Sequence, residues 1–158
     1  GFCSREEKVR LGIASMNIMY YMAAQLMKNN QPFILENNFE KISKEPLLKI
    51  LAKYSYTAIT VTLTGKYSEI YKRFVERNNS PDRHRGHVVN DCYPEKTLNK
   101  DMNPVSYENF VSGIIARGMD SFVANGPHII MDTTDFSKIH IDTLIKKINN
   151  YREEILHG

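Results

Sequence analysis

Arginines crowd into one short stretch of this 158-residue chain. Arg73 and Arg77 are four residues apart, which places both guanidinium groups on one face of a helix. Arg83, Arg85 and His87 follow in the polar sequence behind that helix. A planar guanidinium donates two parallel hydrogen bonds to phosphate, and phosphoryl transfer needs positive charge around the migrating group. The stretch predicts contacts with a phosphate-bearing ligand, although a solvated helix face paired with neighbouring acids explains the same spacing.

Polar side chains also stand directly behind two apolar runs. Glu36 ends the first run, where a carboxylate can hold a Mg²⁺-bound water or orient a hydroxyl nucleophile. The alternative for Glu36 is a turn cap or a pair with an arginine. Asn38 is a neutral hydrogen-bonding neighbour, with a turn role as its alternative. Asp132 and Thr133 follow the second run and are expected at the same rim.

Two further patterns are weaker. The letters TGK (64–66) suggest a phosphate loop, but GxxxxGK[ST] requires glycine where Thr60 stands and Ser or Thr where Tyr67 stands. A zinc site is disfavoured because the ligand spacing is irregular, and the histidines are expected to be exposed or to contact phosphate. Its candidate ligands would be His84, His87, Asp91 and Cys92.

The elements that must position these residues alternate along the chain. Helical spacing of apolar residues predicts helices at 5–29, 44–53, 67–77, 106–117 and 141–154. Short apolar or β-branched runs predict strands at 33–36, 57–64 and 128–131. Strands separated by helices favour a single α/β domain over 1–158, with a parallel sheet flanked by helices. Ligands bind such sheets beyond the carboxyl ends of the strands.

A long polar connection spans residues 78–104, and connections of that length are usually functional or mobile. The net charge is +3, the apolar fraction is 42% and the charged fraction is 25%, which together exclude a disordered tail and favour a globular domain. No apolar run approaches the roughly 20 residues of a membrane span, so no membrane partner is expected. Cys3 and Cys92 form no CxxC pattern, which favours a reducing, cytoplasmic location.

Four segments in this order resemble the P-loop small-molecule kinases of the nucleotide-kinase-like group, whose relatives include zeta-toxin-type and chloramphenicol-phosphotransferase-type proteins. They are PFILENNF (32–39), AITVTLTGKYSEIYKRFVERN (58–78), SPDRHRGH (80–87) and HIIMDTTDF (128–136). The resemblance covers essentially the whole chain. It implies a P-loop kinase-like sheet and transfer of the γ-phosphoryl group of ATP or GTP to a hydroxyl of a small-molecule acceptor, with Mg²⁺.

The resemblance also implies residue roles. Glu36 would lie near Mg²⁺ and the acceptor, with Asn38 beside it. Arg73 and Arg77 would face the phosphates from the helix that leads into a lid, which the 78–104 loop resembles. Within that lid Arg83 and Arg85 would close over the triphosphate, and Arg83 and His87 would alternatively touch the acceptor. Asp132 and Thr133 would lie beside the nucleotide.

The departure from the group lies at the start, where its members have a strand, GxxxxGK[ST] and a helix. None of these precedes Phe2, so we expect this chain to be a fragment of a longer polypeptide, seen without the first βαβ unit, and by itself inactive. The segments 33–36 and 57–64 would then have no strand between them. The alternative is a non-catalytic module that binds a phosphorylated ligand or nucleic acid. Nucleic acid is the weaker option, because aromatic residues do not alternate with the basic ones.

Overall fold

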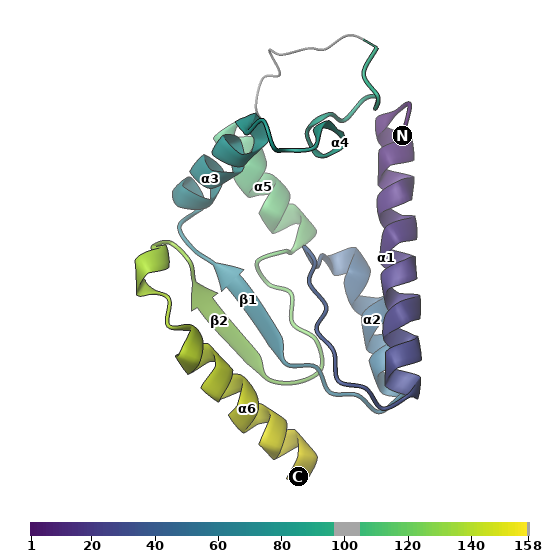
Figure 1. Cartoon of the computed structure of the whole chain (residues 1–158), viewed down its shortest axis with the longest axis vertical. Helices are drawn as coiled ribbons and strands as arrows, with labels where there is room; N and C mark the ends of the chain where they lie inside the picture. The colour runs from purple at the N-terminus through teal and green to yellow at the C-terminus, as the bar shows by residue number, and fades with distance from the viewer. Residues whose placement is uncertain (97–104, 158) are drawn as a thin grey trace.

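The computed structural model describes residues 1–96 and 105–157. Two short strands lie beside each other, and the helices surround them (Figure 1). The helices are α1 (Arg5–Lys28), α2 (Lys41–Lys53), α3 (Tyr67–Asn79), α4 (Arg85–Val88), α5 (Tyr107–Arg117) and α6 (Ile141–His157). The strands are β1 (Thr60–Thr64) and β2 (His128–Asp132), and a 3₁₀ turn follows at Phe136–Lys138.

The sheet of the described residues consists of β1 and β2 in parallel, with Thr60 opposite His128 and Thr64 opposite Asp132. The hydroxyl of Thr62 lies 2.8 Å from Nε2 of His128, which adds a side-chain bond to the register. Parallel pairing of the β-branched run with the later strand confirms the expected α/β class. The sheet is smaller than predicted, because the third expected strand does not form.

The prediction of a strand at 33–36 is wrong. These residues have no strand hydrogen bonding, and Ile34 is 94% exposed. A strand needs a neighbour to pair with, and the described residues place none beside this segment. The segment is the extended connection between α1 and α2 (Figure 1).

The buried core lies where the second half of α1 packs on α2. Tyr20, Ala23 and Met27 meet Leu47 and Leu51 there, and Phe122 closes the cluster. The buried hydroxyl of Tyr20 donates to the carbonyl of Ser43 at 2.8 Å, so this polar group of the core has a hydrogen-bond partner.

The first half of α1 extends beyond this core. Val9 and Ile13 continue the apolar spacing of the helix, yet they are 54% and 40% exposed. The helix starts where predicted, because the Ser4 hydroxyl accepts from the backbone N–H of Glu7 at 3.2 Å. The Glu7 carboxylate accepts from the backbone N–H of Cys3, one residue before the position a capping box uses.

Two other helices, α3 and α5, pack on each other. Helix α3 packs on α5 through the aromatic rings of Tyr71, Phe74 and Phe110, with centroids 5.0 Å apart for Phe74 and Phe110. Helix α5 ends at Gly118, whose φ of 67° is the left-handed conformation that glycine adopts without strain. None of the described helices is both long and apolar enough to cross a membrane.

Candidate functional site

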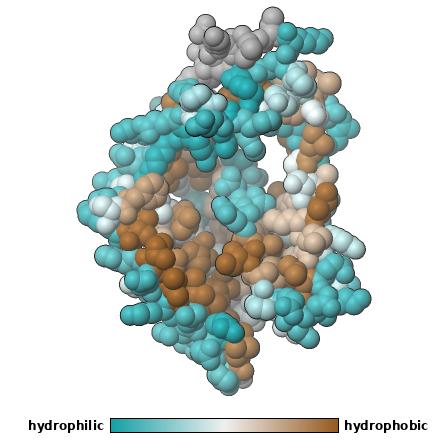
Figure 2. Space-filling view, viewed as in Figure 1, coloured by the Kyte–Doolittle hydropathy of each residue, from teal (hydrophilic) through white to brown (hydrophobic). Residues whose placement is uncertain are grey.

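A cavity of about 820 Å³ opens between β1, the extended connection 35–39 and the helices α3 and α5. Figure 2 shows apolar side chains over the strand region and a depression between them and the α1–α2 side. The cavity brings together five of the residues that the sequence singled out. They are Glu36, Asn38, Arg73, Arg77 and Thr133.

The acidic wall comes from the connection between α1 and α2. Phe39 fixes the end of this connection, because its ring stacks on Phe122 with centroids 4.9 Å apart. Glu36 and Asn38 precede it and line the cavity. Within the described ranges, the exposed Glu36 carboxylate has no ion-pair partner. A carboxylate without an ion-pair partner can orient a hydroxyl group that enters the cavity, and it can accept the proton of that hydroxyl group.

The basic wall is α3, where the two arginines have different surroundings. The Arg73 guanidinium donates to the carbonyls of Thr133 and Thr134 at 2.6 and 2.9 Å. It also stacks over the ring of Phe136, with Cζ 4.2 Å from the centroid. These contacts make Arg73 a clamp between α3 and the turn after β2, in addition to lining the cavity.

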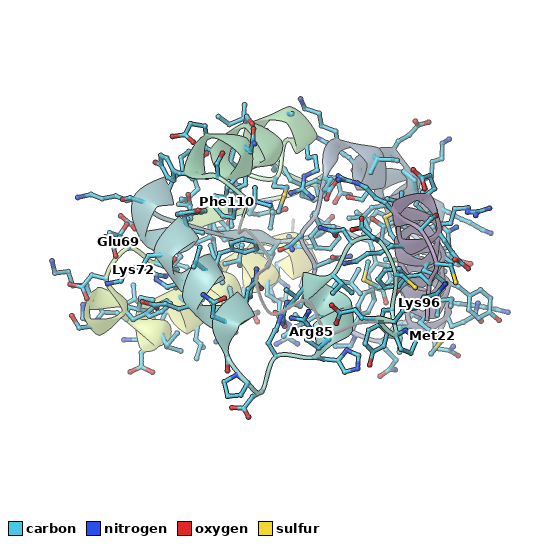
Figure 3. The ribbon with its side chains drawn as sticks, turned by 90° about the horizontal axis from the view of Figure 1, so that it is seen from above. Met22, Glu69, Lys72, Arg85, Lys96 and Phe110 are labelled. Atoms are coloured by element: carbon cyan, nitrogen blue, oxygen red, sulfur yellow. The ribbon has the colours of Figure 1, made fainter. Side chains whose placement is uncertain are left out.

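Arg77 lies one helical turn later and is exposed. Among the described side chains it has neither a hydrogen-bond nor an ion-pair partner. Figure 3 shows that Glu69 and Lys72 lie on the outer side of α3, while Phe110 lies between α3 and α5. Arg77 is therefore a cationic group on the cavity side of α3 whose donors are available to an anion.

The turns after β1 and β2 are joined to each other. The Thr133 hydroxyl donates to the carbonyl of Thr64 at 2.7 Å, and the backbone N–H of Lys66 donates to the Thr134 hydroxyl at 2.8 Å. A side chain on Gly65 would meet the Thr134 backbone nitrogen at 3.0 Å, so glycine permits this close approach. The turn is a tight link between strand ends rather than a loop that wraps an anion.

Asp132 is the last residue of β2, next to this turn, and does not line the cavity. Its carboxylate accepts from the backbone N–H of Thr134 at 2.7 Å. Hydrogen bonds from Thr134, with a smaller contribution from the charge of Lys66, lower the pKa of Asp132. The aspartate therefore shapes the turn with its negative charge.

The remaining predicted residues lie in the loop that contains α4, outside the cavity. The Arg85 guanidinium forms a bidentate pair with Glu95, at 2.8 and 2.6 Å, so this arginine is held by a carboxylate of its own loop. Figure 3 shows Arg85 on the α4 side of the molecule. The part of the predicted lid at 97–104 lies outside the described residues.

Arg83 and His87 form the other half of this loop. Nε of Arg83 is buried and has no hydrogen-bond partner in the described structure. The charge of Arg83 is the largest cause that lowers the pKa of His87, followed by burial and by the charges of three further basic groups. These three are His84, Lys8 and Arg77. Arg77 is thus the residue shared by the cavity and by this basic cluster.

Sequence reasoning missed several polar residues of the cavity. The Tyr67 hydroxyl donates to the Asp120 carboxylate at 2.9 Å, and burial together with this carboxylate raises the pKa of Tyr67. Arg117 pairs with Glu40 at 3.0 Å. Arg117 precedes the helix-ending Gly118 and Asp120 lies two residues after it, and neither belongs to a motif that indicates a site.

The described residues hold no cluster of three or more His, Cys, Asp or Glu side chains that could bind a metal ion by themselves. The zinc site that the sequence disfavoured had His84, His87, Asp91 and Cys92 as its candidate ligands, and these do not form such a cluster in the described structure. A Mg²⁺ ion requires fewer protein ligands, because one or two carboxylates and the oxygens of a bound phosphate suffice. The Glu36 carboxylate fits the role of such a protein ligand.

A crystal structure from Chloroflexus aurantiacus, described as a "putative kinase", is similar to this chain. The TM-score is 0.64 and the sequence identity is 19%, and the match covers 96% of this chain and 75% of that chain. At this identity the similarity shows the fold, which is a kinase-like α/β fold. No protein-family model matches the chain, and no curated protein matches it.

Proposed function

We propose that this cavity is part of a phosphotransferase site, which moves the γ-phosphoryl group of ATP or GTP to a hydroxyl of a small-molecule acceptor. One observation carries the proposal: Glu36 and Arg77 line the same cavity from different elements, and neither has a described ion-pair partner. A carboxylate and a guanidinium in one cavity supply the acceptor-orienting and charge-stabilising groups of phosphoryl transfer. The similarity to a structure described as a kinase supports the same reaction class.

Each residue has a distinct part in this proposal. Glu36 orients the acceptor hydroxyl and takes its proton, and Asn38 offers a neutral hydrogen bond to the acceptor. Arg77 stabilises the negative charge that spreads over the phosphoryl oxygens. Arg83 and His87 approach the same phosphates, or the acceptor, from the α4 loop. Arg73 positions the wall of the cavity through its contacts with Thr133 and Thr134.

Mg²⁺ and the nucleotide enter this proposal as bound groups. Glu36 would hold Mg²⁺ through a water molecule, and the ion would supply positive charge that neutralises the phosphates. The 158 residues contain no GxxxxGK[ST], and the turn at Gly65 is occupied by its contacts with Thr134. The proposal therefore assigns the acceptor side and the arginine side of the site to this chain, and not the cradle of the triphosphate.

The test uses the longer polypeptide that is expected to carry this chain, because the triphosphate cradle is not assigned to these 158 residues. The substitution is Arg77→Ala, and Lys72→Ala is its matched control, because Lys72 lies on the outer side of the same helix (Figure 3). Thermal melts with Mg²⁺–ATP and Mg²⁺–GTP measure binding, and release of the diphosphate with a panel of hydroxyl acceptors measures turnover. Ligand at about 100 times its dissociation constant adds roughly 2.7 kcal/mol of stability, which a melt detects. We expect Arg77→Ala to weaken ligand binding and turnover at least about tenfold, which roughly halves the ligand-induced stabilisation at that concentration, with an unchanged melt of the ligand-free protein.

The alternative is a phosphate-binding module without catalysis, in which the arginines of the cavity bind a phosphorylated ligand. The same measurements separate the two. A ligand-induced shift that depends on Arg77, without diphosphate release for any acceptor, supports the binding module. If Arg77→Ala and Lys72→Ala had equal effects, the cavity would be the site of neither catalysis nor phosphate binding.

A further inference from the structure

The segment before α1 is joined to the loop after α4 by a single antiparallel bridge. The backbone N–H of Phe2 donates to the carbonyl of Tyr93 at 2.9 Å, and the N–H of Tyr93 donates to the carbonyl of Phe2 at 2.8 Å. Phe2 is buried, and its ring faces that of Tyr93 with centroids 6.4 Å apart. The bridge thus connects two parts of the chain that are 91 positions apart in the numbering.

This pairing sets Cys3 opposite Cys92. In an antiparallel pair the position after one residue faces the position before its partner, and a mutually hydrogen-bonded pair is followed by a non-hydrogen-bonded one. Cα atoms of such a pair are about 4.5 Å apart, which falls within the separation that disulfides span. Both cysteines are free in this structure, with Cys3 exposed and Cys92 half-buried.

The electrostatics agree with this juxtaposition. The Cys92 side chain raises the pKa of Cys3 both by its charge and by a hydrogen bond between the two side chains, and the charge of Glu7 raises it further. This effect of the Cys92 thiol on Cys3 agrees with the placement of the two residues opposite each other beside the Phe2–Tyr93 bridge.

We propose that Cys3 and Cys92 form a redox-modification site, which a low-molecular-weight disulfide such as oxidised glutathione converts into an intramolecular disulfide. The raised pKa keeps most of Cys3 in the thiol form at neutral pH, so its thiolate fraction grows as the pH rises. This thiolate attacks one glutathione sulfur, and the other glutathione leaves as a thiolate. The Cys92 thiolate then attacks the Cys3 sulfur of the mixed disulfide, and the second glutathione leaves. Both cysteines are oxidised by one electron each, the oxidant is reduced to two glutathione thiols, and these take the two thiol protons.

The bond has a structural consequence that does not depend on the proposed phosphotransferase activity. It fastens the start of α1 to the loop that carries His84, Arg85 and His87. The described contacts between these regions include the Phe2–Tyr93 bridge and the hydrogen bonds from Lys8 to Val89 and Asn90. A covalent link restricts the motion of this loop and removes conformational freedom from the unfolded chain, because the closed loop contains about 90 residues.

The test is oxidation of the purified chain with oxidised glutathione, followed by intact mass and peptide mapping without reductant. We expect the product to lose the mass of two hydrogen atoms, to carry a Cys3–Cys92 linked peptide and to melt roughly 5–15 °C higher than the reduced protein. In Cys92→Ser, we expect a stable glutathione adduct on Cys3. The reduced variant should melt like the reduced wild type, which controls for its fold.

Other products would overturn the proposal. A wild-type chain that keeps a glutathione on each cysteine shows that the two sulfur atoms do not meet in solution. Dimers linked through Cys3 show that the exposed thiol reacts between molecules instead. A Cys3–Cys92 bond that leaves the melting temperature unchanged overturns the proposed restriction of the loop.

Discussion

Two arginines one turn apart on α3 show how residues of the same type acquire different roles. Arg73 is half-buried and its donors are used by the carbonyls of Thr133 and Thr134. Arg77 is exposed and keeps its donors available within the described structure. The i, i+4 spacing predicted that both would share a face, and the cavity confirms this. The spacing carried no information about Arg73 and the turn, because that partner lies 60 positions later.

Arg73 therefore yields a prediction about stability. Arg73→Ala removes two hydrogen bonds from a charged donor and the contact with the Phe136 ring, and we expect the free energy of unfolding to fall by about 2–4 kcal/mol. Arg73→Lys should recover less than half of this loss, because an ammonium group lacks the planar fork and the stacking face. Urea unfolding measures both variants. Full recovery by lysine would mean that charge alone, and not the two-carbonyl geometry, matters at this position.

His87 yields a prediction about pH. Neighbouring cations, Arg83 above all, lower the pKa of His87 from its usual 6.5, so the folded protein binds this proton more weakly than the unfolded chain. The free energy of unfolding should therefore decrease as the pH falls below about 6.5 and through the lower folded pKa. An NMR titration of the imidazole measures this pKa directly, and His87→Gln should flatten the acid limb of the stability profile. We expect inorganic phosphate to raise the pKa of His87. A pKa at or above 6.5 without anions would show that the basic side chains do not cluster around His87 in solution.

At the scale of elements, local signals were sufficient wherever an element is stabilised by its own sequence. The ends of α1, α5 and both strands lie within a few residues of the predictions, because caps, β-branched runs and Gly118 act locally. The 33–36 prediction failed because a strand depends on a pairing partner that the sequence of the strand does not reveal. Dependence on distant parts of the chain also explains why the sequence analysis identified Glu36, and not Asp120, as a residue of the cavity. Glu36 follows an apolar run, whereas Asp120 enters the cavity only through the packing of α5.

Two glycines test how β2 is positioned. A side chain at Gly126, just before β2, would meet the carbonyl oxygen of Ala58 at 2.5 Å, so the backbone on one side must move. We expect Gly126→Ala to lower the free energy of unfolding by about 1–3 kcal/mol. Gly113 lies inside α5 with open space around it, and Gly113→Ala should instead raise that free energy by roughly 0.5–1 kcal/mol. Equal effects of the two substitutions would show that the approach of residues 57–58 to Gly126 is looser in solution.

At the scale of the whole molecule, the chain exposes more surface than its mass requires. Its accessible surface is 11586 Å², whereas a compact monomer of 18.3 kDa exposes about 8,100 Å². Part of the difference lies on the sheet. Leu63 and Ile130 lie on opposite faces by the strand register, and each is 65% exposed. Both faces of the sheet are therefore only partly covered by the described helices.

Adjacent isoleucines in β2 provide the test of this incomplete coverage. Ile129 is 6% exposed and Ile130 is 65% exposed, so the same substitution should have different effects at the two positions. Threonine keeps the β-branched shape, but it places a hydroxyl where a methyl and a methylene packed before. We expect Ile129→Thr to lower the free energy of unfolding by about 2–4 kcal/mol, and Ile130→Thr to change it by less than about 0.5 kcal/mol. If Ile130→Thr lowers the free energy of unfolding as much as Ile129→Thr does, the face of the sheet that carries Ile130 is covered in solution. A melting temperature that then rises with protein concentration would identify a second copy of this chain as the cover, because association stabilises the folded state by mass action.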